Sequence, residues 1–329
     1  MRAYVISEQN GQLSQGVRDF LSSPKDPSDV LVRVEYSSVN FKDAMVASAP
    51  SRVRRVAELV GGVDAAGVVE ASSAEGYPVG LRVAVHGGDL GVGRDGGFAT
   101  QVFSPTRYLS ALPETISTRD AMVIGTAGFT AMASVLALED RGLANAATVL
   151  VTGATGGVGS QSVTYLAAKG YQPVASTGSP DQSAWLTERG AVRVIGRGDI
   201  SDRPGRVLGS ELWDGAIDCV GGVALTEILR SLRYGAAVAA SGLVGSAELA
   251  TTVYPFITRA VALLGIDAVE ATSTTRSRVW AALGAMAPRV DLNSLADRVI
   301  GLDGLDEALD DVRRGTTRGR IVVDLTQGV

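Results

Sequence analysis

Cysteine and histidine are nearly absent from this sequence, with only Cys219 and His86 among 329 residues. No disulfide can form within the chain. A structural zinc usually has four Cys or His ligands, and common catalytic zinc sites use three side chains that include His or Cys. We therefore expect no metal site. Neither residue lies in a nucleophile motif, so the chemistry of an enzyme with this sequence would come from an organic cofactor.

Lysine is also scarce, because only Lys25, Lys42 and Lys169 contribute to the 30 basic residues. We attribute this scarcity to a compositional bias toward arginine. The 35 acidic residues give a net charge of -5. Binding of nucleic acid requires a strong basic excess or a basic stripe, so we expect no nucleic-acid partner.

Long hydrophobic runs are missing as well, since no apolar stretch approaches the roughly 18 residues of a membrane helix. The first residues, MRAYVISEQNGQLSQ, lack the apolar segment of a signal peptide. Hydrophobic residues make up 46% of the chain, which is ample for a large packed core. We expect a soluble cytoplasmic protein without a membrane partner.

The length of the chain is about twice that of a typical domain, and its texture changes near residue 121. Residues 1–120 contain short apolar or alternating runs between Gly, Pro and Ser clusters, which predicts a compact antiparallel barrel or sandwich. Beyond that point strands alternate with helices, which predicts a parallel sheet covered on both faces. The expected strands of this sheet are Thr148–Thr152, Tyr171–Ser176, Val192–Ile195, Asp214–Val220, Ala236–Ser241 and Ala260–Ile266.

A glycine-rich turn joins the first of these strands to a helix, with the sequence GATGGVG at Gly153–Gly159. Aligned on the dinucleotide fingerprint G-x-G-x-x-G, the three positions are Ala154, Gly156 and Gly159. Gly156 lets the backbone approach a pyrophosphate, and the helix N-terminus offers free N–H groups and partial positive charge. The alternative is a purely structural turn, but the strand-turn-helix context favours dinucleotide binding. The expected cofactor-binding residues here are Ala154, Thr155, Gly156, Gly157 and Val158.

The end of the second strand distinguishes NAD from NADP. An NAD enzyme usually has an acidic residue there to hold the ribose 2′-hydroxyl. This chain instead has Ser176, Thr177 and Ser179, with no acid before Asp181. Their hydroxyls would accept a 2′-phosphate, and Arg197 could wrap back to supply positive charge. Arg197 as an ordinary surface residue is the alternative, but we favour NADPH as the cofactor.

The chain as a whole resembles a zinc-free medium-chain dehydrogenase/reductase of the acryloyl-CoA reductase and quinone oxidoreductase branch. The resemblance implies an α/β architecture, in which residues 1–122 and 267–329 form a GroES-like catalytic domain. A Rossmann domain with a doubly wound parallel sheet, residues 123–266, would be inserted between them. The matching segments are SSVNFKDAM at Ser37–Met45, GVDAAGVV at Gly62–Val69, GTAGFTAM at Gly125–Met132, VTGATGGVGS at Val151–Ser160, VASTGS at Val174–Ser179 and TTVYPFITRAVALLGID at Thr251–Asp267.

The resemblance also implies roles for single residues. Asn40 would lie near the nicotinamide and orient the substrate carbonyl, although it is equally suited to cap the helix that begins at FKDAMVA. Thr130 would touch the cofactor phosphates, with simple packing as its alternative. Strand ends line the cofactor crevice of such sheets. We therefore expect Ser241, Gly242 and Leu243 to meet the nicotinamide ribose, with Ile266 close by.

Several positions depart from relatives or are better explained by structure. Zinc relatives have a Gly-His-Glu motif where this chain has Val63 and Asp64, so Asp64 is best read as a hydrogen-bonding core carboxylate. Lys42 and Asp43 are interpreted as ion-pair or capping residues, and His86 as structural. Ser179 stands where the family has a basic residue. Cys219 ends an apolar strand and is expected to be a buried thiol.

These features favour hydride transfer from NADPH to the β-carbon of an α,β-unsaturated carbonyl compound or thioester such as acryloyl-CoA. One alternative is an NADPH-dependent quinone oxidoreductase, and another is an NADPH-binding protein without turnover. The expected partners are small molecules, namely an enone, an enoyl thioester or a quinone. A homodimer is expected by family analogy, with the strand near Ala260–Ile266 pairing across an edge.

Overall fold

The computed structural model describes residues 1–326 and separates the chain into two compact units. Unit 1 contains Met1–Ala127 together with the segment that begins at Ala268, and unit 2 contains Gly128–Asp267. The boundaries fall after residues 127 and 267, where the sequence suggested 122 and 266. Unit 2 is therefore continuous in sequence, whereas unit 1 is assembled from both ends of the chain.

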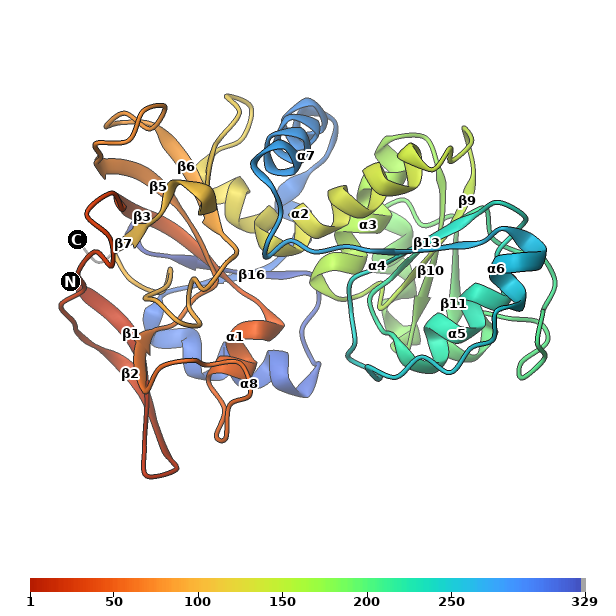
Figure 1. Ribbon diagram of the computed structural model, residues 1–329, viewed down its shortest axis with the longest axis horizontal. Helices are drawn as coiled ribbons and strands as arrows, with labels where there is room; N and C mark the ends of the chain where they lie inside the picture. The colour runs from red at the N-terminus through yellow and green to blue at the C-terminus, as the bar shows by residue number, and fades with distance from the viewer. Residues whose placement is uncertain (327–329) are drawn as a thin grey trace. The chain divides into compact units, whose positions relative to one another are not determined.

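Unit 1 is built on a seven-stranded, mostly antiparallel sheet (Figure 1). The last of its strands pairs on one side with β3 and on the other with β15, so a strand from the end of the chain lies inside the sheet. The strands are β3 (Val30–Val39), β5 (Asp64–Ala71), β6 (Arg82–His86), β7 (Gln101–Ser104), β8 (Leu109–Ala111), β15 (Ala296–Ile300) and β16 (Arg320–Asp324).

A second, three-stranded sheet completes the β-rich part of unit 1, with β1 (Arg2–Gln9) between β2 (Gln12–Asp19) and β4 (Glu58–Val60). Strands β1 and β2 form a hairpin whose two turn residues, Asn10 and Gly11, have φ of 53° and 78°. Positive φ at both positions is typical of a type I′ turn, which matches the twist of the paired strands. Apolar side chains from the two sheets share one core, which includes Ile6, Val32, Leu59, Val83, Phe98, Ile321 and Val323.

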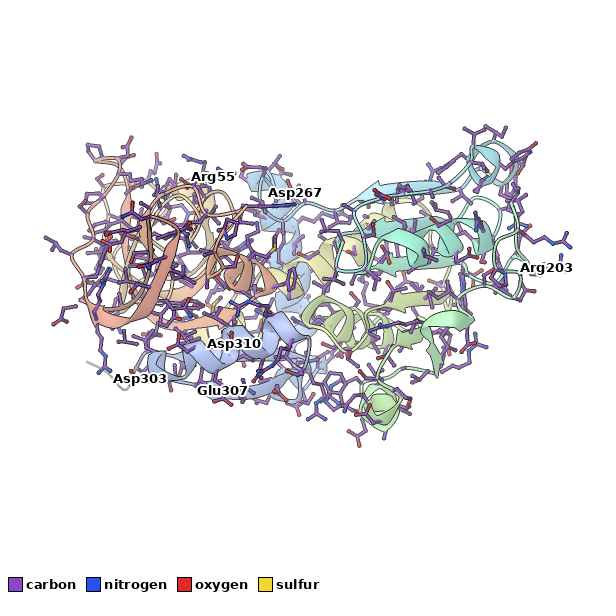
Figure 2. All side chains as sticks on the ribbon, turned by 90° about the horizontal axis from the view of Figure 1, so that it is seen from below. Arg55, Arg203, Asp267, Asp303, Glu307 and Asp310 are labelled. Carbon is purple, nitrogen blue, oxygen red and sulfur yellow. The ribbon has the colours of Figure 1, made fainter. Side chains whose placement is uncertain are left out.

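Three α-helices belong wholly to unit 1: α1 (Phe41–Val46), α7 (Ser273–Met286) and α8 (Leu305–Arg314). Helix α8 is amphipathic, because Leu305 and Leu309 are buried in the core while acidic side chains face outward. The acidic side chains include Asp303 in the turn before the helix, followed by Glu307 and Asp310 (Figure 2).

Unit 2 is a six-stranded parallel sheet with the order β11-β10-β9-β12-β13-β14. From β9 the chain steps one way to β10 through α3, and from β12 it steps the other way to β13 through α5. With right-handed crossovers these helices cover opposite faces (Figure 1). The elements are β9 (Thr148–Thr152), α3 (Gly157–Ala168), β10 (Gln172–Thr177), α4 (Ser183–Glu188), β11 (Arg193–Gly196), β12 (Gly215–Asp218), α5 (Gly222–Ser231), β13 (Ala237–Ala240), α6 (Tyr254–Arg259) and β14 (Ala262–Gly265).

Helix α2 (Thr118–Asp140) corrects one expectation from the sequence, that no apolar run approaches the length of a membrane helix. By length and composition alone this helix could cross a membrane, but 83% of its most apolar 18-residue window is buried. Such burial is typical of a core helix. The predicted interruption near Gly125 is present, since this residue has non-helical backbone angles of 52° and -164°.

The predicted architecture, a β-rich GroES-like domain with an inserted doubly wound parallel sheet, is thus confirmed. Each strand expected for the parallel sheet is present, with ends that differ by no more than two residues. All six of these strands run in the same direction, so their carboxyl ends lie along one edge of the sheet. In such sheets this edge carries the ligand site.

Candidate functional site

The glycine-rich turn connects β9 to α3 in the way the sequence predicts. Gly156 occupies the N-cap position of α3, and no side chain caps the helix there. The first N–H groups of an α-helix have no partner within the helix, so they need a capping side chain, water or a ligand. Thr155, Gly156, Gly157 and Val158 are partly exposed, and this end of α3 is therefore accessible to a ligand anion.

Gly159, one turn into α3, shows why the motif needs glycine for packing. A Cβ at this position would lie 2.3 Å from the carbonyl oxygen of Gly153. Gly156 differs, because a Cβ there would meet only the same oxygen at 3.4 Å, an ordinary contact. The packing of the protein itself thus requires glycine at position 159 but not at position 156. Ala154 is fully buried at the base of the turn, and its N–H donates to the carbonyl of Ser176 (3.2 Å).

The end of β10 holds the residues that were predicted to choose between NAD and NADP. Ser176 and Thr177 are buried, with 2% and 5% exposure, and Ser179 donates its N–H to the hydroxyl of Thr177 (3.0 Å). Strand β11 pairs alongside, with Gly196 opposite Thr177. Arg197 follows directly and folds back over Gly178, where an added Cβ would lie 2.3 Å from the guanidinium carbon.

Arg197 is exposed, and no described residue accepts a hydrogen bond from it or pairs with its charge. The structure therefore places an uncompensated guanidinium beside the carboxyl end of β10, in the position that the sequence suggested. Thr177 and Ser179 lie at the same strand end. A phosphate at this corner would find charge-assisted donors, and it would meet no acidic residue within the segment 176–180.

The neighbouring strand ends of unit 2 contain a buried acidic residue that sequence reasoning missed. Asp218, at the end of β12, accepts hydrogen bonds from the Thr152 hydroxyl (2.6 Å) and the Gly221 N–H (2.8 Å). Burial raises the pKa of this carboxyl. Asp218 thereby ties the end of β9, where the glycine turn starts, to the turn that follows β12. The available signal for Asp218 in the sequence was an Asp at the end of a short apolar strand, GAID.

Cys219 and Ser241 follow β12 and β13, the next two parallel strands. Burial, with a smaller contribution from Asp218, raises the pKa of the Cys219 thiol to about 12, so this thiol is not a reactive nucleophile. The Ser241 N–H donates to the Asp218 carbonyl (3.0 Å). Gly242 packs directly on the backbone of Cys219, where an added Cβ would lie 2.0 Å from its carbonyl oxygen.

The remaining predicted cofactor residues also belong to unit 2 but differ in exposure. Leu243 is 60% exposed after β13, and Ile266 follows β14 and donates its N–H to Ala240 (3.0 Å). Thr130 is nearly buried within α2, where its carbonyl accepts from the Ser134 hydroxyl (2.8 Å). The structure thus gathers the turn after β9, Ser176, Thr177, Ser179, Arg197, Ser241, Gly242, Leu243 and Ile266 at strand ends, and it places Thr130 on a helix.

Asn40, the predicted catalytic residue, lies in unit 1 on the wall of a small cavity of about 40 Å³. Its backbone has the N-cap position of α1, but its side chain points to other partners. The amide nitrogen donates to Asp64 (2.8 Å) and to the Ser38 carbonyl (3.3 Å), while the amide oxygen accepts from Arg320 (3.1 Å). The cavity is lined by Asn40, Lys42, Val63, Gly87, Gly88, Leu90, Thr126, Ala268 and Val269.

Asp64 is the centre of the polar network behind this cavity and is completely buried. It accepts hydrogen bonds from the Ser38 hydroxyl (2.7 Å) and from both the N–H and the hydroxyl of Thr126. Burial alone would raise its pKa, but the positive charge of Arg320 and the Thr126 donors outweigh burial, so the pKa of Asp64 is lowered. The carboxylate is therefore ionised, as a hydrogen-bonding core carboxylate should be.

Arg320 supplies the compensating charge from β16, far away in the sequence. Its guanidinium lies 3.5 Å from Asp64 and donates to the Ser38 hydroxyl (2.7 Å) and the Val39 carbonyl (3.1 Å). Sequence reasoning did not identify this partner. The residue is only 3% exposed, and the available signal in the sequence was an arginine directly before the apolar run IVV of β16.

Asp43 is a second buried carboxylate in the same region, and its interpretation as a capping residue agrees with the structure. One oxygen accepts from the Asn40 N–H (2.8 Å) and the other from the Val63 N–H (2.9 Å). Burial raises the pKa of Asp43 to about 7, with a further contribution from the charge of Asp64. Lys42 differs from its interpretation, because no described residue forms an ion pair with it.

His86 lies opposite Asp64 on β6, but its ring contacts helix α7. Trp280 donates to Nε2 (3.4 Å), and the Arg276 guanidinium lies 3.2 Å from the ring nitrogens. Both neighbours are donors only, so the imidazole accepts from them in its neutral form. Burial and the charge of Arg276 lower the pKa of His86 to about 3. This environment agrees with a structural role.

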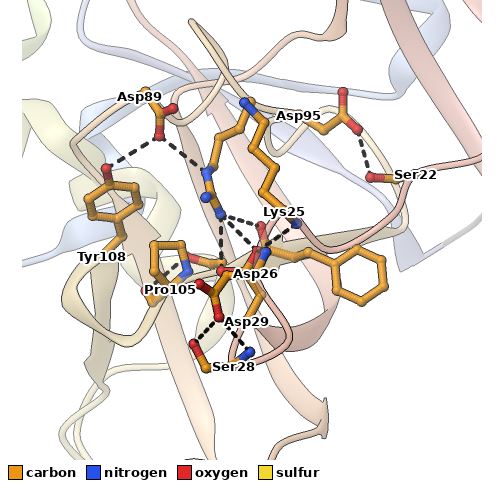
Figure 3. Close-up of polar contacts among 12 residues, drawn as sticks. Ser22, Lys25, Asp26, Ser28, Asp29, Asp89, Asp95, Pro105 and Tyr108 are labelled. Atoms are coloured by element: carbon orange, nitrogen blue, oxygen red, sulfur yellow. Dashed lines mark hydrogen bonds and ion pairs between the residues drawn. The ribbon is translucent and has the colours of Figure 1, made fainter.

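The loop between β6 and β7 borders the cavity through Leu90 and is held by Arg94. Asp89 of this loop also faces Tyr108 (Figure 3). The Arg94 guanidinium donates to Asp89 (3.1 Å) and Asp29 (3.2 Å), and its side chain is only 9% exposed. Tyr108 completes the cluster with a hydrogen bond to Asp89 (3.3 Å). These contacts tie the loop to Asp29, which precedes β3, and to Tyr108.

A metal site would need several ligands at one place. Within residues 1–326 no group of three or more His, Cys, Asp or Glu side chains is arranged to hold a metal ion. Asp64 is occupied by Arg320 and hydroxyl donors at the position where zinc relatives carry their motif. Independence from zinc stays a prediction.

Comparison with known proteins agrees with this architecture. The alcohol dehydrogenase GroES-like domain family matches residues 26–114, and the zinc-binding dehydrogenase family matches residues 157–288. The acrylyl-CoA reductase AcuI of Ruegeria pomeroyi is 40% identical over 319 residues, which cover 97% of this chain and 96% of that protein. The chain belongs to the medium-chain dehydrogenase/reductase family. It is therefore an oxidoreductase by family, of the branch that includes these reductases.

Two solved structures bear on the cofactor of this medium-chain reductase. The yhdH oxidoreductase from Salmonella enterica, in complex with NADP, superposes with a TM-score of 0.94 at 37% identity, covering 99% of this chain and 100% of that one. The putative quinone oxidoreductase YhfP of Bacillus subtilis is 42% identical over 303 residues, 92% of this chain and 91% of that protein. Its structure has NAD bound, with a TM-score of 0.94 at 38% identity and coverage of 98% and 99%.

Proposed function

We propose that this protein is an NADPH-dependent reductase that adds hydride to the β-carbon of an α,β-unsaturated carbonyl compound or thioester such as acryloyl-CoA. The observation that carries the cofactor choice is the unpaired Arg197 guanidinium over Gly178 at the end of β10. The acrylyl-CoA reductase of Ruegeria pomeroyi and the NADP complex of the Salmonella protein support the proposal. The NAD complex of YhfP makes the cofactor the first point to test.

The residues of unit 2 fit a dinucleotide. The uncapped start of α3 would face the pyrophosphate, and Gly156 leaves room for its close approach. Arg197, Thr177 and Ser179 would hold the 2′-phosphate, while Ser176 lies beneath them. Reduced nicotinamide, when bound, supplies the hydride. The ribose contacts proposed for Ser241, Gly242, Leu243 and Ile266, and the phosphate contact proposed for Thr130, complete the site.

The cavity of unit 1 provides the surface for the acceptor. Val63, Leu90 and Val269 would shield the reacting carbons from water, and Asn40, on the same cavity wall, would orient the carbonyl. Asn40 would do so through the hydrogen that it now shares with the Ser38 carbonyl, the longest of its bonds at 3.3 Å. Its other bonds, to Asp64 and Arg320, fix the amide in one orientation. The protein thus contributes position and polarity, while the cofactor contributes the reducing power.

The decisive experiment follows the absorbance of reduced nicotinamide, with NADPH and NADH offered separately. Each is paired with acryloyl-CoA, a simple enone and a benzoquinone. We expect NADPH oxidation by acryloyl-CoA, with a higher kcat/KM than benzoquinone gives. The variant Arg197→Gln should lower the NADPH-over-NADH preference by about tenfold or more, because a charge-assisted contact is lost. Arg203→Gln is the matched control, an exposed arginine of unit 2 whose loss should leave the preference unchanged (Figure 2).

The alternatives are separated by the same panel. Turnover with benzoquinone but not with enoyl compounds would identify a quinone oxidoreductase, the activity named for the Bacillus subtilis relative. Tight NADPH binding without oxidation by any acceptor would indicate a binding protein without turnover. A wild-type preference for NADH would overturn the role of Arg197.

A homodimer in the cytoplasm is the proposed state of the protein. Strand β14 is an edge strand with β13 as its one partner, and Leu263 on it is 38% exposed. Exposed apolar residues on the preceding segment, including Val253 and Ile257, extend the apolar surface. Pairing of two such edges would satisfy open backbone groups. Light scattering on the purified protein tests this proposal, and a mass of one chain at micromolar concentration would contradict it.

A further inference from the structure

Lys42 is the unusual group in the cavity of unit 1. The other two lysines of the chain are engaged, since Lys25 donates to the Gly93 carbonyl and Lys169 pairs with Glu139 (3.1 Å). Lys42, in contrast, is partly buried on α1 and lines the cavity together with Asn40 and Thr126. No described residue accepts a hydrogen bond from its ammonium group.

The other polar side chains of the cavity wall have already committed their hydrogens. Asn40 donates to Asp64 and to the Ser38 carbonyl. The Thr126 hydroxyl donates to the other Asp64 oxygen. An ammonium group carries three N–H donors. No described residue takes any of them, so Lys42 offers free donors beside the single hydrogen that Asn40 now shares with the Ser38 carbonyl. Of the cavity-lining side chains that unit 1 provides, Lys42 is therefore best suited to an anionic oxygen.

The charges around the cavity support the same conclusion. The negative charge of Asp64 is balanced by Arg320 at 3.5 Å. Asp43 turns away from solvent toward the N–H groups of Asn40 and Val63. The charge of Lys42 is therefore not neutralised by the carboxylates of its own helix or of the network behind it. A positive charge in a partly buried position stabilises a developing anion more strongly than the same charge in bulk water.

We propose that Lys42 is a catalytic residue that holds the enolate oxygen formed during reduction, an inference that rests on the proposed function. When hydride from reduced nicotinamide bonds to the β-carbon, the electron pair of the C=C bond moves to the α-carbon and the carbonyl oxygen takes the negative charge. The ammonium group of Lys42 donates a hydrogen bond to that oxygen. A proton from solvent then bonds to the α-carbon, the carbonyl re-forms, and Lys42 is unchanged.

The kinetic test compares Lys42→Met and Lys42→Arg with the wild type, using NADPH and the best acceptor of the panel. Methionine keeps an unbranched chain but no donor, so kcat should fall about 100-fold, as for loss of one oxyanion donor. The KM for the acceptor should change little, because the interaction develops mainly in the transition state. Lys42→Arg keeps charge and donors and should recover at least a tenth of the wild-type kcat. Lys169→Met is the charge-matched control and should retain full activity.

A second acceptor separates catalysis from structure. An alkylidene malonate gives an enolate that its second carbonyl already stabilises, so Lys42→Met should lose much less activity with it than with a thioester. Equal losses with both acceptors, or kcat within threefold of wild type, would overturn the role of Lys42. If wild-type protein reduced no enoyl acceptor, the proposed function would fail, and this inference with it.

Chemical modification provides a readout that does not depend on turnover. Brief treatment with acetic anhydride, followed by peptide mass spectrometry, measures the labelling of each of the three lysines. Oxidised NADP together with a saturated acyl-CoA product should protect Lys42 from labelling at least threefold, while Lys169 stays equally reactive. Unchanged labelling of Lys42 under saturating ligands would contradict contact with the substrate.

Discussion

The candidate sites of the two units are built from different kinds of chemical group. In unit 2 the candidate site consists of backbone N–H groups, glycines and small hydroxyls at strand ends, with the single guanidinium of Arg197 added. In unit 1 the cavity is supported by buried ionisable side chains, with Asp64 paired to Arg320 and Asp43 bonded to backbone donors. The difference suggests a division of labour. Under the proposed function, backbone groups of unit 2 would hold the dinucleotide, whereas unit 1 would bind the acceptor next to buried charges.

This comparison also explains where tolerance to substitution should lie. A site formed by backbone groups is disrupted when an added side chain collides with them. At Gly159, for example, a Cβ would lie 2.3 Å from a carbonyl oxygen. A network of buried charges loses stability when one member is removed, because the remaining charge has no partner in a poorly solvated interior. The predictions below test the two modes of failure separately.

The largest effect is expected from Arg320→Met, which removes the counter-charge of Asp64 and the donors to Ser38 and Val39. Loss of one partner of a buried ion pair typically costs about 3–5 kcal/mol of unfolding free energy. Urea denaturation measures the loss. The double variant Asp64→Asn with Arg320→Met should cost less than the sum of the two single changes, because no unpaired charge remains.

The control for this prediction is Arg314→Ala, which breaks a surface pair with Asp311. The Arg314 side chain is 62% exposed, so its loss should cost less than about 1 kcal/mol. Equal destabilisation by Arg320→Met and Arg314→Ala would show that the buried network does not hold unit 1 together.

The next effect is the pH dependence of the unfolding free energy, to which Asp43 and His86 contribute with opposite signs. The folded chain keeps Asp43 protonated up to about pH 7, whereas the unfolded chain releases this proton near pH 3.8, so its contribution to stability declines as pH rises between those values. His86 stays neutral in the folded chain down to about pH 3 but binds a proton near pH 6.5 when unfolded. Its contribution therefore declines as pH falls from 6.5 to about 3.

Between about pH 3.8 and 6.5 the two slopes should offset each other in the wild type. Asp43→Asn should leave a stability that rises with pH in this window, and His86→Gln one that falls, each by up to about 1.4 kcal/mol per pH unit. Urea midpoints measured across this window provide the test. Parallel curves for the two variants would show that these groups do not titrate as described.

The smallest effect on the unfolding free energy is expected from Gly156→Ala. This variant best separates the stability of unit 2 from its binding of the cofactor. The protein itself has room for this Cβ, with one contact at 3.4 Å and ordinary backbone angles, so stability should stay within about 0.5 kcal/mol. The methyl group would occupy space that a pyrophosphate needs, and we expect about tenfold weaker NADPH binding in a fluorescence titration. Gly198→Ala, with no atom within 4 Å of the new Cβ, is the control.

Gly159→Ala gives the contrasting result within the same motif. Its Cβ would meet the backbone of Gly153 and Ala154, so the turn must shift and stability should fall as well. If Gly156→Ala bound NADPH as tightly as the wild type, the interpretation that the backbone of this turn approaches the dinucleotide closely would be wrong.

Local signals in the sequence predicted much of the fold. Each strand of the parallel sheet was expected because a short apolar run stands between turn residues, and the break in α2 was expected because Gly125 interrupts an Ala-rich helix. The hairpin of β1 and β2 was not singled out, although Asn10-Gly11 is a strong turn signal. Strand β15 was missed because the adjacent Asp297 and Arg298 interrupt its short apolar run.

The positions of some residues of the candidate site could likewise be inferred from the sequence, whereas others could not. Arg197 follows a strand that is adjacent to β10, so its position could be inferred from the order of a parallel sheet. The partner of Asp64 could not, because Arg320 lies 256 residues away and the pairing depends on how β16 enters the sheet. The unpaired state of Lys42 was also hidden, because its neighbour Asp43 suggested an ion pair while the carboxylate is turned toward backbone donors.

The position of β16 inside the sheet has a consequence for synthesis on the ribosome. Unit 2 is complete once residue 267 has left the exit tunnel, whereas unit 1 waits for the strand at Arg320–Asp324 to fill the place between β15 and β3. Until then Asp64 lacks Arg320 as its counter-ion, and the segment of β3 from Tyr36 to Val39 lacks the strand that pairs with it there. Unit 2 can therefore fold on the ribosome before unit 1 is complete, and any activity that needs both units waits for the last strand.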